Sequence, residues 1–513
     1  MIGWHGADWK SLHPLIDAGL MPNLRSIVER GAAGNVKAVG PNVPALLWTT
    51  VATGKMADRH GVLSGVECDP ISGQLRPAGN STRRVKALWN IAMQSGRIAH
   101  VAGWCAAHPA EPLNGSSITP DFVRPLTQAG QPWPVLPGSI HPERLRVIAA
   151  ELRVHAGELT GDDLAPFIPA LSQIDQEKDG RVLELADILA KAIGMHAIVT
   201  WLMENEPWDL MMIGWEALDR ACHRFMRYAP PQMPPVTAED CARYGGIVNA
   251  MYCFYDLFLG RLMRLAGPDA TFVIVSAAGF RSASERPVSP HLQALPGAWY
   301  RPYGMLAMAG PNIVADELVH GVTVLDVAPT VLAALGLPAA HDMPGKIIEG
   351  AFIDASAPAR VESWEDIPGD CGMPARESES EQRASAAALA ELHNAGYREP
   401  ANPVEVTIQR ERLLNTALLQ VTGGRYADAR PVLAKLVAES PGDSRIRLWL
   451  AHCHITCRDA QACREMLRGI SREGMTGALA HLIEARVEAH ERNPATAIPW
   501  NQFEEALKRR LGE

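Results

Sequence analysis

Short apolar runs that alternate with longer helical patterns are the feature that most limits the folds open to this chain. The runs at 210–214, 272–275 and 305–309 are bounded by glycine or polar residues, as expected of strands buried on both faces. Residues 19–32 and 245–266 instead carry apolar side chains at helical spacing. Strands that alternate with helices predict an α/β fold with a central, mostly parallel sheet flanked by helices.

Composition and charge argue against several classes of function. The 513 residues exceed one ordinary core, so two domains are expected. The net charge of -9, without a long block of basic residues, argues against a nucleic-acid surface. No run reaches the roughly 18 apolar residues of a membrane span. Nine scattered cysteines and the lack of an N-terminal signal segment predict a reduced, cytoplasmic location.

Four segments within roughly the first 355 residues carry recognisable motifs. They are Ile2 to Trp9, Trp48 to Lys55 with His60-Gly61 after it, Leu218 to Met226, and Leu325 to Leu332 followed by Gly336 to Pro338 and Asp342 to Gly345. In this order they resemble the type I phosphodiesterase/nucleotide pyrophosphatase branch of the alkaline phosphatase superfamily. The resemblance implies an alkaline-phosphatase-like domain over 1–360 with a helical insertion at about 110–200. Family members have more apolar residues before the position of Ile2, which implies a shortened first strand or a truncated start.

The C-terminal part has a different character. Residues 361–403 are rich in Glu, Ser, Asp, Gly and Pro and are expected to form a linker. Beyond them, Asn415 to Ala417 and Gly424 to Ala429 resemble a tetratricopeptide repeat. A second unit follows 33 positions later, with Ala462 in the place of Ala429. Leu467 is shifted by one residue from the place of Leu433, and the spacing is close to the expected period of about 34. We predict a small all-α, tetratricopeptide-like domain over 404–513 that binds a protein partner, either an active relative or a second copy.

The resemblance implies a two-metal site, and this chain has lost most of its ligands. Enzymes of the superfamily hold two metals about 4 Å apart, which activate a Ser or Thr nucleophile and clamp phosphoryl oxygens. The positions that bind the first metal here hold His5, Pro44, Ala277 and Ala278. Pro44, in the nucleophile's place, has no side-chain heteroatom, and two alanines cannot bind metal. His5 keeps a nitrogen but loses the negative charge, and we interpret it as a hydrogen-bonded loop residue.

The positions implied for the second metal hold Asp219, His223 and Tyr300. The first two keep their ligand types four residues apart, whereas a neutral tyrosine replaces imidazole poorly toward zinc or manganese. Asp219 and His223 form either a hydrogen-bonded pair that orders a loop, which we favour, or a residual site for at most one divalent metal (Zn or Mn). We expect no other cofactor. His108 and His291 are further, weaker candidates for replacement nitrogens.

Three rival motifs carry little weight. The sequence Thr53-Gly54-Lys55 is not a P-loop, because Thr49 stands where that motif requires its first glycine. Residues 371–376 resemble a sulfatase nucleophile motif but have one residue too many before the proline. The cluster of His452, Cys453, His454, Cys457 and Cys463 falls in a repeat helix pair, where small cysteines are expected to fill the interface.

Two functions are therefore open. We predict a catalytically inactive phosphodiesterase-fold protein that acts as a binding, scaffolding or regulatory subunit, because the losses described above remove the nucleophile and most metal ligands together. The alternative is an active, metal-dependent phosphohydrolase or phosphodiesterase that uses replacement ligands.

Overall fold

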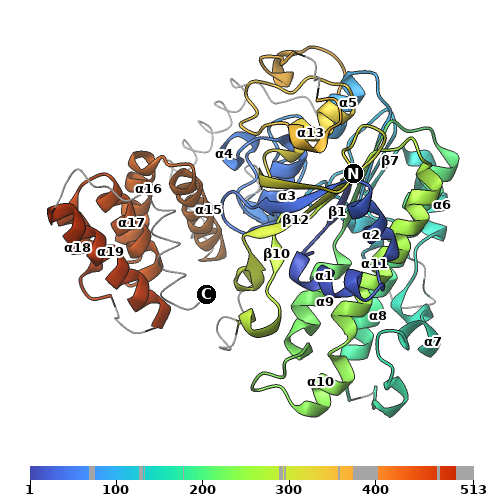
Figure 1. Cartoon of the computed structure of the whole chain (residues 1–513), viewed down its shortest axis with the longest axis horizontal. Coiled ribbons are helices and arrows are strands. Elements are labelled where there is room, and N and C mark those ends of the chain that lie inside the picture. Colours follow the sequence, from blue (N-terminus) through green and yellow to red (C-terminus); the bar gives the residue numbers. More distant parts are fainter. Residues whose placement is uncertain are drawn as a thin grey trace, which may run out of the picture. The chain divides into compact units, whose positions relative to one another are not determined.

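The computed structural model describes residues 1–68, 75–125, 131, 133–176, 178–287, 293, 296–355, 359–373, 403–470 and 474–492 (Figure 1). Most of the predicted linker, 374–402, lies outside these ranges, as does His291. Among the described residues, no helix is both long and apolar enough to cross a membrane.

Nine of the described strands form one mixed, mostly parallel sheet, which confirms the predicted fold class. In spatial order they are β13 (Glu317–Thr323), β2 (Ala32–Lys37), β12 (Tyr303–Ala309), β9 (Phe272–Val275), β1 (Ile2–Trp4), β8 (Leu210–Trp215), β5 (Ala99–Ala102), β6 (Ser116–Ile118) and β7 (Ile140–His141). The strands from β9 to β6 in this order run parallel. The three predicted apolar runs correspond to β8, β9 and β12.

The span predicted as a helical insertion, about 110–200, contributes to the sheet as well. It carries α6 (Arg146–Glu151), α7 (Gly161–Leu164) and most of α8 (Arg181–Asn205). It also carries β6 and β7, which extend the sheet beyond β5. These two strands are three and two residues long, too short to produce a clear alternating pattern in the sequence.

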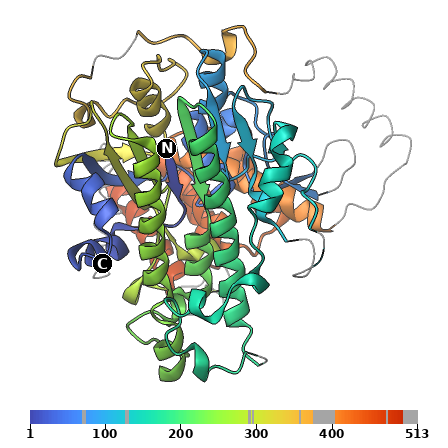
Figure 2. The ribbon, with the colours of Figure 1, turned by 90° about the vertical axis from the view of Figure 1, so that its right-hand side faces the viewer.

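Helices pack in two groups with the sheet between them (Figures 1 and 2). The first group contains α3 (Pro44–Thr53), α5 (Leu88–Gln94) and α13 (Val327–Ala334). The second contains α1 (Trp9–Asp17), α2 (Pro22–Glu29), α8 and α11 (Ile247–Ala266), and α8 and α11 lie side by side in Figure 2. Three further helices of this part of the chain are α4 (Ala57–His60), α9 (Ala217–Phe225) and α10 (Ala238–Tyr244).

One predicted helix is shorter than its apolar pattern. The pattern over 19–32 yields only α2, because Ala32 already begins β2. Gly31 marks this change: a Cβ atom there would lie 1.8 Å from the carbonyl oxygen of Met308 in β12, so only glycine lets the chain join the sheet at this point. The other predicted helix, 245–266, is confirmed as α11.

Helix α3 is buried on all sides. Every residue from Ala45 to Thr53 is buried, and three threonine hydroxyls bond back to carbonyl oxygens one turn earlier, so their polar groups have partners within the helix. Pro44 begins the helix at a position where its missing N–H costs nothing. Gly54 ends it with a φ of 65°, which glycine adopts without strain. The start of α3 is therefore held firmly in place.

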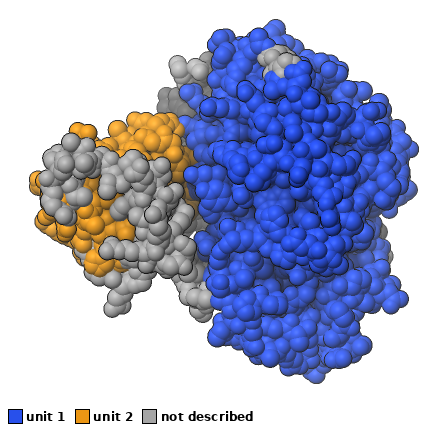
Figure 3. Space-filling model, viewed as in Figure 1, with its two compact units in different colours: residues 1–65, 77–388 blue, residues 66–76, 389–513 orange. Residues whose placement is uncertain are grey.

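The chain divides into two compact units, residues 1–65 with 77–388 and residues 66–76 with 389–513 (Figure 3). The second unit contains five helices among its described residues: α15 (Pro403–Thr422), α16 (Tyr426–Glu439), α17 (Ser444–Thr456), α18 (Ala460–Leu467) and α19 (Gly474–Arg492). Consecutive helices α15 to α18 contact one another as antiparallel repeat pairs do. The predicted all-α domain is therefore present.

The register of the repeats differs from the sequence prediction by one residue. Cys463, not Ala462, is the fourth residue of its helix, as Ala429 is of α16, and both are fully buried. Leu467 likewise matches Leu433, so the spacing is 34 (463 − 429 and 467 − 433) rather than 33. Cys453 and Cys463 lie in two different apolar clusters, as expected for packing residues.

The second unit also includes nearly all of a small two-stranded sheet of β3 (Val66–Cys68) and β4 (Leu75–Pro77), of which Pro77 alone belongs to the first unit. Strand β3 packs against α15, and Glu67 lies 3.9 Å from Arg412 and 2.9 Å from Arg76. Part of the first repeat helix is thus covered by residues from the chain's own N-terminal half.

Candidate functional site

The carboxyl ends of three neighbouring strands bring the predicted site residues together. Strands β9, β1 and β8 are adjacent and parallel, so the residues that follow them share one edge of the sheet, where ligand sites of such sheets lie. His5 follows β1, Ala277 and Ala278 follow β9, and Asp219 lies in the first turn of α9, just after β8. The His5 ring packs edge-on against Trp48 of α3, with centroids 5.1 Å apart.

Three positions at this edge offer no ligand and no nucleophile. Ala277 and Ala278 are 2% and 7% exposed, and their methyl groups replace the carboxylate and imidazole that the family resemblance implies. Pro44, which the resemblance assigns to the position of the nucleophile, stands at the start of α3 and has no hydroxyl for attack on phosphorus. Neither a covalent intermediate nor a first metal can be held here by these side chains.

Asp219, His223 and Tyr300 form one hydrogen-bonded group. The Tyr300 hydroxyl lies 2.9 and 3.0 Å from the two carboxylate oxygens of Asp219, to which it donates. It also lies 3.1 Å from Nε2 of His223. Burial, and then the negative charge of Asp219, raises the pKa of Tyr300, so the hydroxyl stays protonated. Burial lowers the pKa of His223, so its imidazole is neutral near pH 7.

This group does not fit a metal centre. A zinc ion takes its nitrogen and oxygen ligands at about 2.0–2.2 Å. The Tyr300 oxygen lies within hydrogen-bonding distance of both Asp219 and His223, so it occupies the space in which an ion bound to these two side chains would lie. Among the residues that the structure describes, no three His, Cys, Asp or Glu side chains gather as metal ligands. His108 pairs instead with Asp121, 3.5 Å away. The ring nitrogen Nδ1 of His5 is buried without a hydrogen-bond partner within the described ranges.

A further acidic side chain at this edge, Asp8, already has hydrogen-bond and ion-pair partners. It is 2% exposed, caps α1 by accepting from the backbone N–H of Lys10, and accepts from Nη1 of Arg301 at 2.7 and 2.8 Å. A Cβ atom on Gly279 would lie 2.1 Å from this carboxylate, so glycine makes room for the ion pair. Neither Asp8 nor Arg301 stands out in the sequence, because nothing local marks two residues 293 positions apart as partners.

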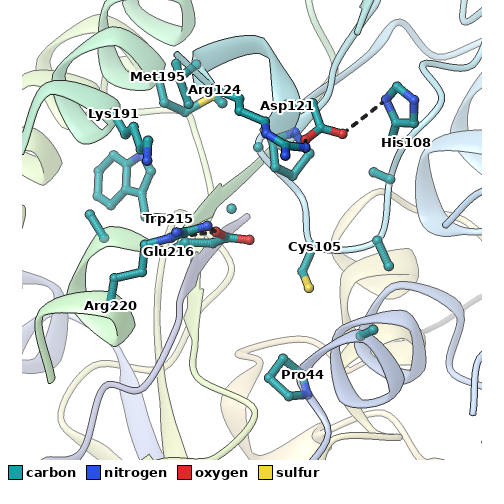
Figure 4. Close-up of a pocket in the computed structure, with 18 of the residues that line it drawn as sticks. Pro44, Cys105, His108, Asp121, Arg124, Lys191, Met195, Trp215, Glu216 and Arg220 are labelled. Carbon is teal, nitrogen blue, oxygen red and sulfur yellow. Dashed lines mark hydrogen bonds and ion pairs between the residues drawn. The ribbon is translucent and has the colours of Figure 1, made fainter. Parts of the chain in front are cut away.

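A cavity of about 620 Å³ opens beside these residues (Figure 4). It lies over the ends of β5 and β8 and against the start of α3. Pro44 and Cys105 line one side of it, and Lys191 of α8, Glu216 and Arg220 line another. The charged side chains already have partners: Lys191 lies 2.5 Å from Asp187, and Arg220 lies 2.9 Å from Glu216. The residues from α8 were not predicted from the sequence, because only the fold brings that helix to the cavity.

Cys105 is the one thiol in this cavity among the described residues, and its surroundings make it a poor nucleophile. Burial raises the pKa of the thiol well above its usual value, and the negative charges of Glu216 and Asp219 add to the effect. The thiolate, rather than the thiol, attacks electrophiles. The surroundings of Cys105 therefore suppress the reactive form.

Comparison with known proteins agrees with this architecture. The family model for type I phosphodiesterase/nucleotide pyrophosphatase matches residues 1–298, more than half of the 513 residues. The chain belongs to this family. A tetratricopeptide repeat model matches residues 421–487. No curated protein matches the chain significantly.

Several solved structures resemble the chain at low sequence identity. Human ectonucleotide pyrophosphatase/phosphodiesterase 5 is 12% identical, with 67% of this chain and 96% of that chain covered and a TM-score of 0.38. A mutant of the alkaline phosphatase PafA is 10% identical over 68% and 98%, with a TM-score of 0.42. Phosphonoacetate hydrolase from Sinorhizobium meliloti is 18% identical over 55% of each chain, with a TM-score of 0.33.

Proposed function

We propose that this protein is a catalytically inactive member of the type I phosphodiesterase/nucleotide pyrophosphatase family that acts as a binding, scaffolding or regulatory subunit. The observation that carries the proposal is the combination of Pro44 at the start of α3 with Ala277 and Ala278 at the end of β9. Phosphoryl transfer in this superfamily needs a nucleophile and two metals at these positions. Removal of a single oriented electrostatic group commonly costs about 10² to 10³ in rate, and here several groups are lost together.

The remaining side chains at the site support the same proposal. Asp219 and His223 are tied to Tyr300, and Asp8 is tied to Arg301. At most one divalent metal, Zn or Mn, could be held near Asp219 and His223, and only after rearrangement of Tyr300. The strands and helices around these positions are retained, which is what a protein that keeps a binding surface but not the chemistry requires.

Assays of phosphoester hydrolysis test the loss of catalysis. The purified chain should show no turnover of nitrophenyl phosphate or bis-nitrophenyl phosphate above the buffer rate with zinc, manganese, magnesium or calcium. The matched variants are Asp219→Ala at the site and Asp269→Ala at an exposed position. A metal-dependent rate that disappears in Asp219→Ala and survives in Asp269→Ala would show that the protein is an enzyme with replaced ligands.

The repeats are the part of the chain that we propose binds a partner protein. Stacked helix pairs present a face built from their first helices, here α15 and α17, and such faces commonly hold a segment of another protein. Strand β3 already packs against part of α15. We expect the partner to be an active relative or a second copy of this chain.

Affinity capture and light scattering test this assignment. A tagged full-length chain should recover a partner or form a dimer, and a chain that lacks 415–513 should lose both properties while its α/β unit stays folded by circular dichroism. Unchanged recovery after the deletion would assign the interaction to the α/β unit, and the repeats would then serve to stabilise the protein.

A further inference from the structure

Asp219, His223 and Tyr300 meet in a buried position that depends on three separate elements. Asp219 is 8% exposed and Tyr300 is 5% exposed. Asp219 and His223 lie one turn apart on α9, while Tyr300 belongs to β11 (Tyr300–Arg301). Strand β11 pairs with β10 (Gly279–Phe280), which directly follows the two alanines at the end of β9. The hydroxyl group therefore joins α9 to the segment that has lost its metal ligands.

The Tyr300 ring is fixed by its neighbours. Phe280 lies edge-on to it with ring centroids 5.7 Å apart, and Phe280 stacks on Trp299 at 5.6 Å. The His223 ring also packs edge-on against both Phe280 and Tyr300, at 4.9 and 5.3 Å. A ring held on several sides cannot easily swing away from Asp219, so the hydroxyl is a permanent part of the site.

The carboxylate of Asp219 needs such a partner. A buried carboxylate is costly unless it is paired with a cation or accepts hydrogen bonds. Among the described residues, no lysine or arginine forms an ion pair with Asp219, and Nε2 of His223 lies 3.7 Å from its carboxylate. The tyrosine donates to both carboxylate oxygens, and a His223 with its proton on Nε2 donates in turn to the tyrosine oxygen.

We propose that the Tyr300 hydroxyl replaces a metal ion at this site: it holds Asp219 and His223 together and keeps metal ions out. The inference rests on the proposed function, because it assumes that the site has no catalytic role to preserve. It adds a specific cause, since one side chain both stabilises the remaining ligands and blocks the site. Replacing it with imidazole supplies the nitrogen that, with an aspartate and a histidine, completes a common zinc ligand set.

Two substitutions in the full-length protein test this inference. Tyr300→Phe keeps the ring but removes the hydroxyl, so it should lower the melting temperature. Tyr300→His should bind one zinc ion per chain by metal analysis, and zinc should raise its melting temperature. Cobalt in the same variant should give the visible absorption of a protein-bound ion, and this absorption should be lost in Tyr300→His combined with Asp219→Asn. The wild type should show no response to zinc or to chelators.

Matched substitutions at Tyr303 are the control, because this tyrosine lies three residues further along and is 39% exposed. Tyr303→Phe and Tyr303→His should change neither the melting temperature nor zinc binding. Circular dichroism establishes that each variant is folded. A folded Tyr300→His that binds no metal overturns the inference, as does a wild type that binds zinc through Asp219. If Tyr300→Phe is as stable as the wild type, the claim that the hydroxyl holds Asp219 and His223 together is refuted. Turnover of phosphodiesters by the wild type is a separate outcome, which would refute the proposed function.

Discussion

Replacing Glu111 by alanine tests a buried ion pair that holds one wall of the cavity in place. Glu111 lies between β5 and β6, in the segment that follows Cys105, and it is 1% exposed. Its carboxylate accepts from Nη2 of Arg83 at 2.7 and 2.8 Å, from Nε1 of Trp89 at 2.5 Å and from Nδ2 of Asn90 at 3.2 Å. The group joins the cavity segment to α5.

The magnitude follows from what the alanine leaves behind. Arg83 is itself buried, so loss of Glu111 leaves a buried guanidinium without its counter-charge. Breaking a buried pair in this way typically lowers the free energy of unfolding by about 3–5 kcal/mol. Two further donors, on Trp89 and Asn90, lose an acceptor, although Asn90 keeps its bond to the carbonyl oxygen of Cys371. We therefore expect a loss of about 3–5 kcal/mol for Glu111→Ala and a smaller loss for Glu111→Gln, which keeps one acceptor oxygen.

Urea unfolding followed by tryptophan fluorescence measures this loss. The double variant Arg83→Met with Glu111→Ala should lose less stability than the sum of the two single losses, because no unpaired buried charge remains. The control is Asp175→Ala, which breaks an exposed pair with Lys178 and should cost less than about 1 kcal/mol. The reasoning is refuted if Glu111→Ala costs no more than Asp175→Ala, or if the two single losses at the buried pair simply add.

Three further predictions concern other parts of the molecule. Burial lowers the pKa of His60 to about 3, below the unfolded value of 6.5, so the neutral folded form is fully favoured above pH 6.5. Stability should then fall by roughly 1.4 kcal/mol per pH unit as the pH drops from 6.5 toward 3. Urea midpoints at pH 7 and pH 5 should show this loss of stability, and the loss should be smaller in His60→Gln. Gly279→Ala should cost about 1–3 kcal/mol in urea unfolding, because its methyl group would collide with Asp8, and an unchanged midpoint would contradict this close approach. Chelators should leave the thermal unfolding of the repeats unchanged, since Cys453 and Cys463 are packing residues; a lowered melting temperature would instead indicate a metal site.

The fold class and the chemistry open to single side chains can be read from the residues alone. Apolar runs at 210–214 and 272–275 appear as strands at nearly the same bounds, because strands buried on both faces need continuous apolar side chains. Pro44, Ala277 and Ala278 lack a nucleophilic or ligand atom in their side chains, and no arrangement in space can supply one. Their positions in the site were implied by the resemblance, and the fold places Ala277 and Ala278 at the same sheet edge as His5.

How the remaining residues are used depends on packing between distant parts of the chain. Tyr300 is 81 residues from Asp219 in sequence, and only the pairing of β11 with β10 brings its hydroxyl to that carboxylate. Lys191 lines the cavity because α8 passes beside it, and the end of α2 is set by the approach of Gly31 to β12. Each of these contacts joins elements distant along the chain. Local patterns of apolar and polar residues carry no information about such distances, so packing alone fixes them.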